Sequence, residues 1–546
     1  MKIRSITLII VGVLLILILL IYPSFGDQTD EDDPSTPSIG LPSPATHTPA
    51  STAVAEPQKT NADLHAQVTP DDIRITTAPT LVEPAVFEET KEPEDSFNNP
   101  HEANLYQASL KFIADDPDDA DEIAKSIKFI NSLYETASNM CGPLSIAILQ
   151  EAGLLSSTID PHDSWLLCLR EREDCDGLNA LQQNFFPQQT YDYFYSNENV
   201  RNYDFVTNPL QPGDFLYLLA GDTGYDHMLV VTRVDQEGVA YSVTNADRGD
   251  GFKILEELLY HPNKPQEGFF YEFTERSRGM LGMTGNGGMV IIRRKGGLSA
   301  LPSLTKPLDS TLVQGVDWHV FVKDLTTSQI LFESYPNKKF HPTSMIKIPI
   351  AMVAMEILDA QGIYPPDYQS EGYGGRTFEQ LFEAMVVNSE EDATEILTDF
   401  INIYGGEKSV LAAWNIMETT FLPRRTTCFD LANLLEGLYE KRLIHPDMSA
   451  YLLNLMSIET ANDAHYLGPI NTIIDHGVLY NKSGTLLSPT IVNDMGIFVT
   501  DEQAVIIIIS GTPTRDGSVT YEDIQASIED FAIQLGYEIK EAAEQD

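Results

Sequence analysis

The chain has few basic residues and few cysteines for its length. Across 546 residues it carries 34 lysines and arginines against 81 aspartates and glutamates, which gives a formal net charge of −47. A charge of this size repels nucleic acids and anionic lipids, so we expect neither as a partner. The four cysteines are too few for a disulfide scaffold, although Cys168 and Cys175 could form one small disulfide in an oxidising compartment.

Sequence motifs for metals and nucleotides are also missing. The cysteines and histidines show none of the spacings that are typical of zinc sites. Neither H-E-x-x-H nor G-x-x-x-x-G-K occurs in the sequence. The sequence therefore predicts no metal site and no cofactor.

A long apolar run lies at the N-terminus. Lys2 and Arg4 precede the uncharged run Ile6–Tyr22, and the chain becomes acidic from Asp27. The run is just long enough to cross a bilayer, and the positive charge before it holds that end in the cytoplasm. Small residues within Ser24–Gly26 offer a cleavage site for a signal peptidase. We therefore expect an extracytoplasmic protein that is either secreted or anchored in the membrane by this segment.

Composition divides the rest of the chain into linkers and domains. Residues 27–100 contain 15 acidic and three basic residues among Pro, Thr, Ser and Ala, so this stretch cannot bury a core and should form an extended stalk. Residues 295–310 are rich in Gly, Pro and Ser, which is typical of an interdomain linker. We predict five segments: a signal peptide or anchor at 1–26, a disordered acidic linker at 27–103, a first domain at 104–295, a linker at 296–312 and a second domain at 313–546.

The second domain has strand patterns at both ends and helix patterns between them. Residues 319–333 alternate polar and apolar side chains on either side of a turn, which is typical of a hairpin. The middle of the domain, from 347 to 439, repeats apolar residues with the period of an α-helix, and the segments 494–500 and 504–512 are apolar strands. We expect one antiparallel sheet that both ends of the domain form and that helices cover, which is an α+β fold.

A serine and a lysine stand three residues apart in the apolar segment HPTSMIKIPIAM. Ser344 lies where a helix should begin, among unpaired backbone N–H groups that can stabilise an oxyanion. Lys347 lies on the same helix face, and its neighbours are apolar. Burial lowers the pKa of such an amine, so it could accept the serine proton. The alternative is a helix cap followed by a lysine that extends to solvent.

Three motifs follow one another along the second domain. They are HPTSMIKIP at 341–349, FEAMVVNSEEDATEIL at 382–397 and YNKSGTL at 480–486, with NDMGIF after the last of them. In this order they resemble the nucleophile helix, the S-D-N segment and the K-T/S-G strand of the class A β-lactamases and the wider penicillin-recognising serine hydrolases. The resemblance extends over residues 313–536.

The resemblance implies a role for each matching residue. Ser344 would be the acylated nucleophile and Lys347 its proton acceptor or relay, while Ser389 would pass a proton to the departing nitrogen. The backbone N–H groups of Ser344 and Thr485 would form the oxyanion hole. A positive charge and hydroxyls suit a carboxylate, so the strand would bind the substrate through Lys482, Ser483, Gly484 and Thr485.

The chain departs from the family pattern at two places. The S-D-N triplet reads Ser389–Glu391, so the carboxylate of Glu391 replaces a substrate-facing amide, which removes a donor and repels an anionic substrate. The family also carries an E-x-x-L-N loop whose glutamate activates the water that releases the acyl group. The corresponding region, 412–435, is shortened and offers Glu418 without the asparagine. These departures predict acylation of the serine without fast deacylation.

A separate candidate site lies in the first domain. Cys141 directly precedes an apolar helix pattern, and the N-terminus of a helix favours a thiolate. His227 begins a predicted strand and Asn245 ends the next one, so adjacent strands could hold both side chains beside the helix. The histidine would then deprotonate the thiol, and the asparagine would fix the histidine tautomer. The alternative is a buried, inert cysteine with an unrelated surface histidine.

The order of cysteine helix, histidine strand and asparagine strand resembles that of the papain-like peptidases. The sequences CGP and PGD…H resemble the bacterial cell-wall and leader-peptide-cleaving branches of that group. The resemblance extends over residues 125–295. One departure is that papain has an oxyanion-forming glutamine shortly before its cysteine, where this chain has Glu135 and Asn139.

Together the two resemblances imply an α+β protein with a papain-like cysteine domain followed by a β-lactamase-like or D,D-peptidase-like domain. Both sites would cleave amide bonds through covalent acyl-enzymes. We expect a bacterial hydrolase whose serine site acts on β-lactams or D-Ala-ended cell-wall peptides and whose cysteine site acts on peptide cross-bridges. The alternative is a non-catalytic sensor that binds penicillin or cell wall, or is acylated, without turnover.

Overall fold

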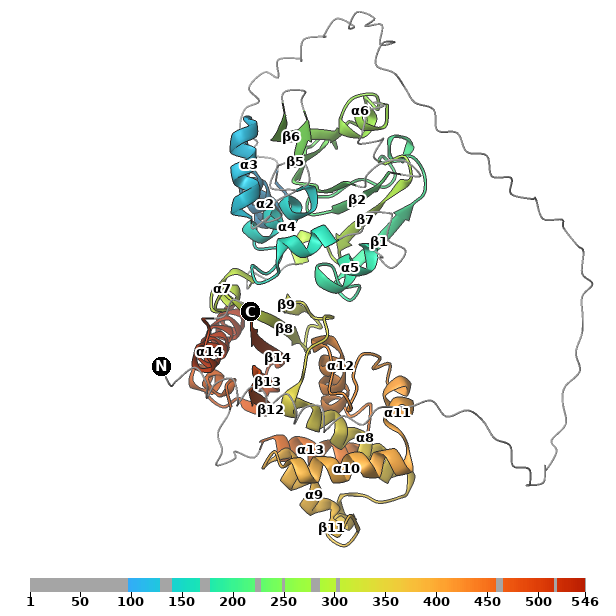
Figure 1. The fold of residues 1–546 in the computed structure, drawn as a ribbon, viewed down its shortest axis with the longest axis vertical. Helices are drawn as coiled ribbons and strands as arrows, with labels where there is room; N and C mark the ends of the chain where they lie inside the picture. The colour runs from blue at the N-terminus through green and yellow to red at the C-terminus, as the bar shows by residue number, and fades with distance from the viewer. Residues whose placement is uncertain are drawn as a thin grey trace, which may run out of the picture. The chain divides into compact units, whose positions relative to one another are not determined.

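The structure is a computed structural model, and it describes residues 97–127, 140–166, 177–220, 227–247, 251–275, 285–300, 305–457, 465–514 and 518–545 (Figure 1). The predicted N-terminal span and most of the acidic linker lie outside the described residues, as do Cys168 and Cys175. Within the described residues, no helix combines the length and the apolar character that crossing a membrane requires.

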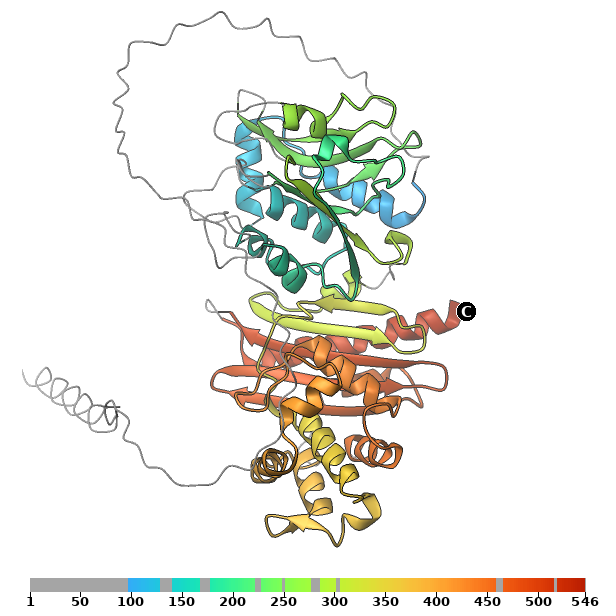
Figure 2. The same cartoon turned by 90° about the vertical axis from the view of Figure 1, so that its right-hand side faces the viewer.

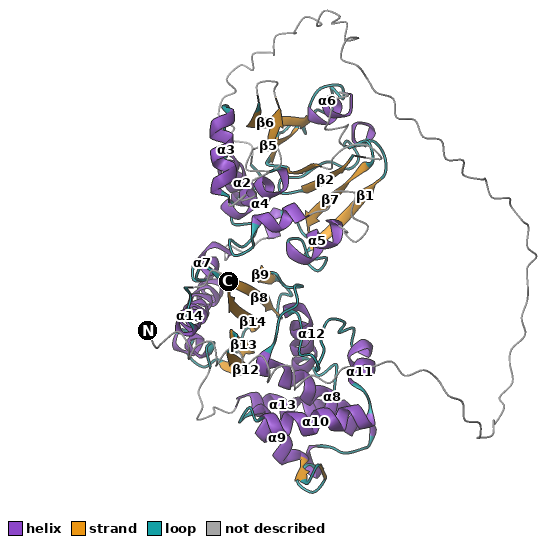
Figure 3. Ribbon diagram, viewed as in Figure 1, coloured by secondary structure: helices purple, strands orange, loops and turns teal. Residues whose placement is uncertain are grey.

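The described part of the first domain combines helices with two antiparallel sheets (Figure 3). One sheet has the strand order β1-β7-β2-β3 and the other has the order β4-β5-β6. The strands are β1 (Tyr191–Ser196), β2 (Phe215–Leu219), β3 (His227–Val230), β4 (Arg233–Val234), β5 (Ala240–Asp247), β6 (Phe252–Tyr260) and β7 (Gly288–Arg294). The helices are α2 (Pro100–Leu110), α3 (Pro117–Ser126), α4 (Cys141–Glu151), α5 (Gly177–Asn184) and α6 (Phe269–Glu275), with the 3-10 turns η2 (Pro161–Leu166) and η3 (Val200–Asn202).

Helix α4 lies in the core of the first domain. Every residue from Gly142 to Leu149 is buried, and the helix packs against β3 and β5. Gly142 permits this close packing, because a Cβ at that position would lie 2.8 Å from Met228 Cε and 3.0 Å from Ser164 Oγ. The packing fixes the position of Cys141, the first residue of the helix.

The second domain is built on a five-stranded antiparallel sheet with the order β12-β13-β14-β8-β9 (Figure 2, where the strands from the start of the domain are yellow-green and those from its end are red). The hairpin predicted at 319–333 is present, and the two ends of the domain meet in one sheet as expected. The strands are β8 (Val316–Asp324), β9 (Ile330–Ser334), β12 (Val478–Leu487), β13 (Thr490–Val499) and β14 (Ala504–Pro513).

Helices connect β9 to β12 and follow β14. The predicted linker at 296–312 is partly structured, because Leu308 and Leu312 are buried in the core of the second domain. The helices of this part of the chain are α7 (Thr305–Asp309), α8 (Lys347–Ala360), α9 (Phe378–Val386), α10 (Glu391–Tyr404), α11 (Glu407–Ala413), α12 (Cys428–Tyr439), α13 (Pro446–Ser457) and α14 (Tyr521–Gln545). The shorter elements are the 3-10 turns η4 (Leu298–Ala300), η5 (Thr343–Ile346), η6 (Pro365–Asp367) and η7 (Gly468–Thr472) and the two-residue strands β10 (Gly372–Tyr373) and β11 (Arg376–Thr377).

Successive apolar side chains along a strand point to opposite faces of the sheet, so helices can cover both faces. Along β14, Ile506 and Ile508 pack into the same core as α8 and α12, whereas Ile507 and Ile509 pack into the core that contains α14. This alternation follows from the two-residue period of a strand. Figure 1 shows α14 on one face of the sheet and α8 and α12 on the other. The segment that carries Ser344 and Lys347 lies at the start of α8, next to β12.

Candidate active site

Ser344 lies in the turn η5, directly before α8 begins at Lys347. Strand β12 passes very close to this turn at Gly484, where a Cβ would come within 2.1 Å of Thr343 Oγ1 and 2.5 Å of the backbone nitrogen of Ser344. Asn493 Nδ2, on the neighbouring strand β13, donates a hydrogen bond to Thr343 Oγ1 at 3.0 Å. The structure therefore brings the first and third sequence motifs together, and glycine at 484 is required for the contact.

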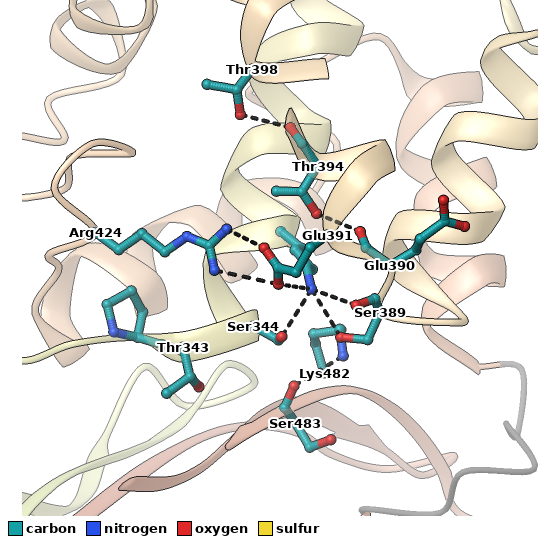
Figure 4. Close-up of polar contacts among 12 residues, drawn as sticks. Thr343, Ser344, Ser389, Glu390, Glu391, Thr394, Thr398, Arg424, Lys482 and Ser483 are labelled. Carbon is teal, nitrogen blue, oxygen red and sulfur yellow. Dashed lines mark hydrogen bonds and ion pairs between the residues drawn. The ribbon is translucent and has the colours of Figure 1, made fainter. Parts of the chain in front are cut away.

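The side chain of Lys347 is fully buried and joins the first and second motifs. Figure 4 shows Ser344, Ser389 and Glu391, which all contact one nitrogen. Its Nζ donates to Ser344 Oγ at 3.0 Å, to Ser389 Oγ at 3.1 Å and to the backbone oxygen of Ser389 at 2.7 Å. It also forms an ion pair with Glu391 Oε1 at 2.6 Å. Four oxygens thus surround one nitrogen, so Lys347 can exchange protons with both serine hydroxyls.

The pKa of the Lys347 amine lies below its usual value. Burial is the main cause, and the charge of Arg424 adds to it. The hydrogen bond and the negative charge of Glu391 act in the opposite direction. The direction agrees with the sequence expectation of a buried amine that can accept a proton, but Glu391 offsets part of the effect.

Strand β12 carries the residues expected to bind a substrate carboxylate. Lys482 is buried, and its Nζ donates to the backbone oxygen of Ser483 at 2.9 Å. Burial, followed by the nearby charge of Lys347, lowers the pKa of Lys482 to about 8. Ser483 and Thr485 are partly exposed. The strand therefore presents a cation and hydroxyl groups beside the nucleophile turn.

Glu391 does not lie as the sequence alone suggested. One of its oxygens pairs with Lys347, and Arg424 Nη2 donates to the other at 2.6 Å. Burial acts to raise the pKa of Glu391, but the hydrogen bonds and charges of Arg424 and Lys347 hold it below its usual value. The expected repulsion of an anionic substrate is therefore offset by two cations at this carboxylate.

Arg424 is the site residue that sequence reasoning missed. It lies in the shortened loop, where backbone hydrogen bonds in both directions between Thr420 and Arg425 close a turn around it. The signal in the sequence was a pair of arginines in a loop where the family carries an acid. The acid of this loop, Glu418, forms an ion pair with Lys339, and its backbone N–H donates to Asp430 at 2.8 Å. Glu418 and Lys347 therefore have different interaction partners.

The comparisons with known proteins find a family match over the second domain. Residues 310–532 match the family model described as the beta-lactamase enzyme family. The second domain is β-lactamase-like. The match does not extend to the first domain, and no curated protein matches the chain.

Several solved structures are similar to part of the chain. PBP-A is 18% identical, with 45% of this chain and all of that one covered and a TM-score of 0.35. The TLA-3 extended-spectrum beta-lactamase is 16% identical, with 43% and 98% covered and a TM-score of 0.37. The beta-lactamase from Sphaerobacter thermophilus is 16% identical, with 42% and 95% covered and a TM-score of 0.34.

In the first domain, the three predicted site residues lie on elements that pack together. Cys141 begins α4, which packs against β3 and β5, the strands that carry His227 and Asn245. Burial lowers the pKa of His227 to about 4, and its Nε2 lies 3.3 Å from Thr244 Oγ1. β3 and β5 pack against each other but belong to different sheets. The expected position of Asn245 at the end of the next strand needs correction, because β4 comes between β3 and β5 in the chain and Asn245 lies two residues before the end of β5. The papain-like interpretation stays a prediction.

Proposed function

We propose that the β-lactamase-like domain is a serine hydrolase that forms an acyl-enzyme through Ser344. The observation that carries this proposal is the position of Lys347 Nζ, which lies 3.0 Å from Ser344 Oγ and 3.1 Å from Ser389 Oγ. One buried amine can therefore take a proton from the nucleophile and return it through the second serine. The proposed substrates are β-lactams and cell-wall peptides that end in D-Ala.

In the proposed acylation step, the neutral amine of Lys347 accepts the proton of Ser344 while Oγ attacks the amide carbonyl carbon. The oxyanion that forms accepts hydrogen bonds from the backbone N–H groups of Ser344 and Thr485. The carbon–nitrogen bond then breaks, and Ser389 passes a proton from Lys347 to the departing nitrogen. One carbon–oxygen bond forms, one carbon–nitrogen bond breaks, and the proton moves from the serine to the amine product.

A carboxylate on the substrate would bind beside β12. At pH 7 most of the Lys482 population is charged, because burial lowers its pKa only to about 8. Ser483 adds a hydroxyl donor next to this cation. The ion pair of Glu391 with Arg424 offsets the charge of this carboxylate, so the cation of Lys482 leaves the surroundings of Ser344 favourable to an anion.

Intact-mass measurement after exposure to penicillin tests this proposal. We expect the protein to gain the mass of one penicillin, and the Ser344→Ala variant to gain none. A chromogenic cephalosporin should be hydrolysed slowly by the protein and not by the variant. Unchanged hydrolysis by Ser344→Ala would refute the assignment of the nucleophile.

A sensor that is acylated without turnover is the second candidate for this domain. The observation that favours it is the position of Glu418, which pairs with Lys339. The same cephalosporin separates the two candidates, because repeated colour release indicates a hydrolase, whereas release of one equivalent or less indicates a sensor.

For the first domain we propose a cysteine peptidase activity that acts on cell-wall peptides. The packing of α4 against β3 and β5 supports it, because these elements carry Cys141, His227 and Asn245. We expect thiol-dependent cleavage of peptide cross-bridges that Cys141→Ala abolishes. Full activity in that variant would rule out this nucleophile.

Export is also part of the proposal, since the proposed substrates lie outside the cytoplasm. Its support is the apolar run Ile6–Tyr22 behind Lys2 and Arg4. Cell fractionation with N-terminal sequencing distinguishes the two forms: a membrane-bound chain that begins at Met1 is anchored, and a shortened chain in the medium is secreted. A chain found only in the cytoplasm would contradict export.

A further inference from the structure

The further inference concerns Glu391, which stands where the family pattern has an amide. Its side chain is half-exposed, and its carboxylate is held from two sides (Figure 4). Oε1 lies 2.6 Å from Lys347 Nζ, and Oε2 lies 2.6 Å from Arg424 Nη2. A carboxylate that two cations fix in place and that still contacts solvent is suited to bind and orient a water molecule.

Glu391 also lies close to the nucleophile. Ser344 Oγ lies 3.0 Å and Glu391 Oε1 lies 2.6 Å from the same nitrogen of Lys347, so the two oxygens are no more than 5.6 Å apart. One water molecule can bridge a gap of this size with two ordinary hydrogen bonds. In an acyl-enzyme, such a water would stand beside the carbonyl carbon attached to Ser344 Oγ.

We propose that Glu391 is the general base that releases the acyl group from Ser344, in place of a glutamate on the loop. The inference rests on the proposed serine hydrolase function and assigns its second half-reaction. Glu391 accepts a proton from the water while the water oxygen attacks the ester carbon. Glu391 then passes this proton to the neutral amine of Lys347, and Lys347 passes a proton on to Oγ as the ester bond to Ser344 Oγ breaks. Water is consumed, and the products are a carboxylic acid and the free serine.

The other acids nearby on the chain have different partners. Glu390, the neighbour of Glu391, pairs with Arg376 at 2.7 Å. Glu418, the acid of the shortened loop, pairs with Lys339. Glu391 is the acid whose carboxylate touches the amine that also touches Ser344.

Arg424 is then a positioning residue for this base. It reaches Glu391 from the loop 33 positions later in the chain, with Nη2 at 2.6 Å from Oε2 and Nη1 at 3.5 Å from Oε1. Arg424 and Lys347 keep the carboxylate ionised, because they hold the pKa of Glu391 below its usual value. A carboxylate with a lowered pKa is a weak base, so we expect this arrangement to give slow deacylation.

The test compares Glu391→Gln with the matched control Glu390→Gln in the full-length protein. Each protein is acylated with penicillin, freed of excess penicillin, and followed by intact mass. We expect Glu391→Gln to form the adduct and to lose it about 100-fold or more slowly than the unmodified protein. The control loses the same charge one residue away and should deacylate at the unmodified rate. Deacylation of Glu391→Gln within threefold of the unmodified rate overturns the inference.

Two further measurements keep the test decisive. Glu391→Asp retains a carboxylate and should deacylate faster than Glu391→Gln, which a merely structural role would not produce. The deacylation rate of the unmodified protein should fall in acid as Glu391 takes up a proton, and this dependence should disappear in Glu391→Gln. Equal rates for the Asp and Gln variants overturn the base assignment. Absence of any adduct in the unmodified protein refutes acylation at Ser344 itself, which separates failure of the proposed function from failure of this inference.

Discussion

Replacing Gly484 with alanine should disable acylation of Ser344 while the domain still folds. The new Cβ would lie 2.1 Å from Thr343 Oγ1, 2.5 Å from the backbone nitrogen of Ser344 and 3.1 Å from that of Met345. The backbone atoms belong to η5 and cannot rotate away as the end of a flexible side chain can. The substitution must therefore move β12 and η5 apart.

The size of the movement sets the size of the effect. Ordinary contact with a Cβ begins at 3.4 Å, so the gap to the Ser344 nitrogen must open by about 0.9 Å. A displacement near 1 Å between a nucleophile and the groups that stabilise its transition state lowers a rate about 100-fold. Overpacking of this kind also costs about 1–3 kcal/mol of stability.

The assay is the rate of acylation by penicillin, measured on folded protein by intact mass at several times. Thermal unfolding of the same samples reports the stability cost separately. The matched control is Gly468→Ala, where the nearest atom to the new Cβ is the Cβ of His465 at 3.4 Å, so neither acylation nor stability should change. Acylation of folded Gly484→Ala within threefold of the unmodified rate would show that β12 does not form part of the site.

Three further predictions follow from single charged groups. Lys347→Met should lower the acylation rate about 1,000-fold at pH 7, because it removes the proton acceptor of Ser344. Intact-mass measurement of samples quenched at several times gives the acylation rate. The KM for an anionic β-lactam should rise above about pH 8 as Lys482 loses its charge, and Lys482→Arg should remove this rise in a pH series of steady-state rates. Burial raises the pKa of Asp494 to about 7 from 3.8, so the folded state binds the extra proton and stability falls as the pH rises between these values, by about 4 kcal/mol at most. Urea unfolding at pH 5 and pH 8 should show this fall, and Asp494→Asn should flatten it.

The sequence was informative where the relevant geometry is local. Ser344 and Lys347 are three residues apart, and the start of a helix brings residues at this spacing together whatever surrounds them. The last two strands of the domain were also predicted, because the short run of isoleucines along β14 is typical of a buried strand. Residues 319–333 alternate with the period of a strand, and they form the hairpin of β8 and β9.

The partners of Glu391 could not be predicted in the same way. Arg424 is 33 positions away in the chain, and its reach depends on how the shortened loop folds. The loop turn is closed by backbone hydrogen bonds between Thr420 and Arg425, and the sequence does not show which side chains this turn will bring near Glu391. Glu418 was the acid that the shortened loop offered, without the asparagine of the family pattern, and the folded loop gives it Lys339 as a partner.

The first domain shows a similar limit. His227 and Asn245 were expected on two adjacent strands that follow each other in the chain. The structure ends β3 at Val230 and starts β4 at Arg233, so β5 pairs with β4 and β6 in a second sheet. The break lies in an apolar run that periodicity alone would continue as one strand.

The two candidate nucleophiles share a feature of their helix starts. Thr377 and Thr427 cap α9 and α12 with side-chain oxygens that accept hydrogen bonds from Gln380 N and Asp430 N. Before Cys141 and Ser344, however, the cap positions hold Met140 and Pro342, whose side chains lack such an oxygen. Leaving a helix start without a capping side chain costs about 0.5–2 kcal/mol. The cost is reasonable where the N–H groups must serve a thiolate or an oxyanion, since a capping oxygen would compete with both. An uncapped start is not particular to these two segments, since α10 and α11 also lack a side-chain cap hydrogen bond. What distinguishes the turn at Ser344 is the close approach of β12 at Gly484 to the backbone nitrogen of Ser344.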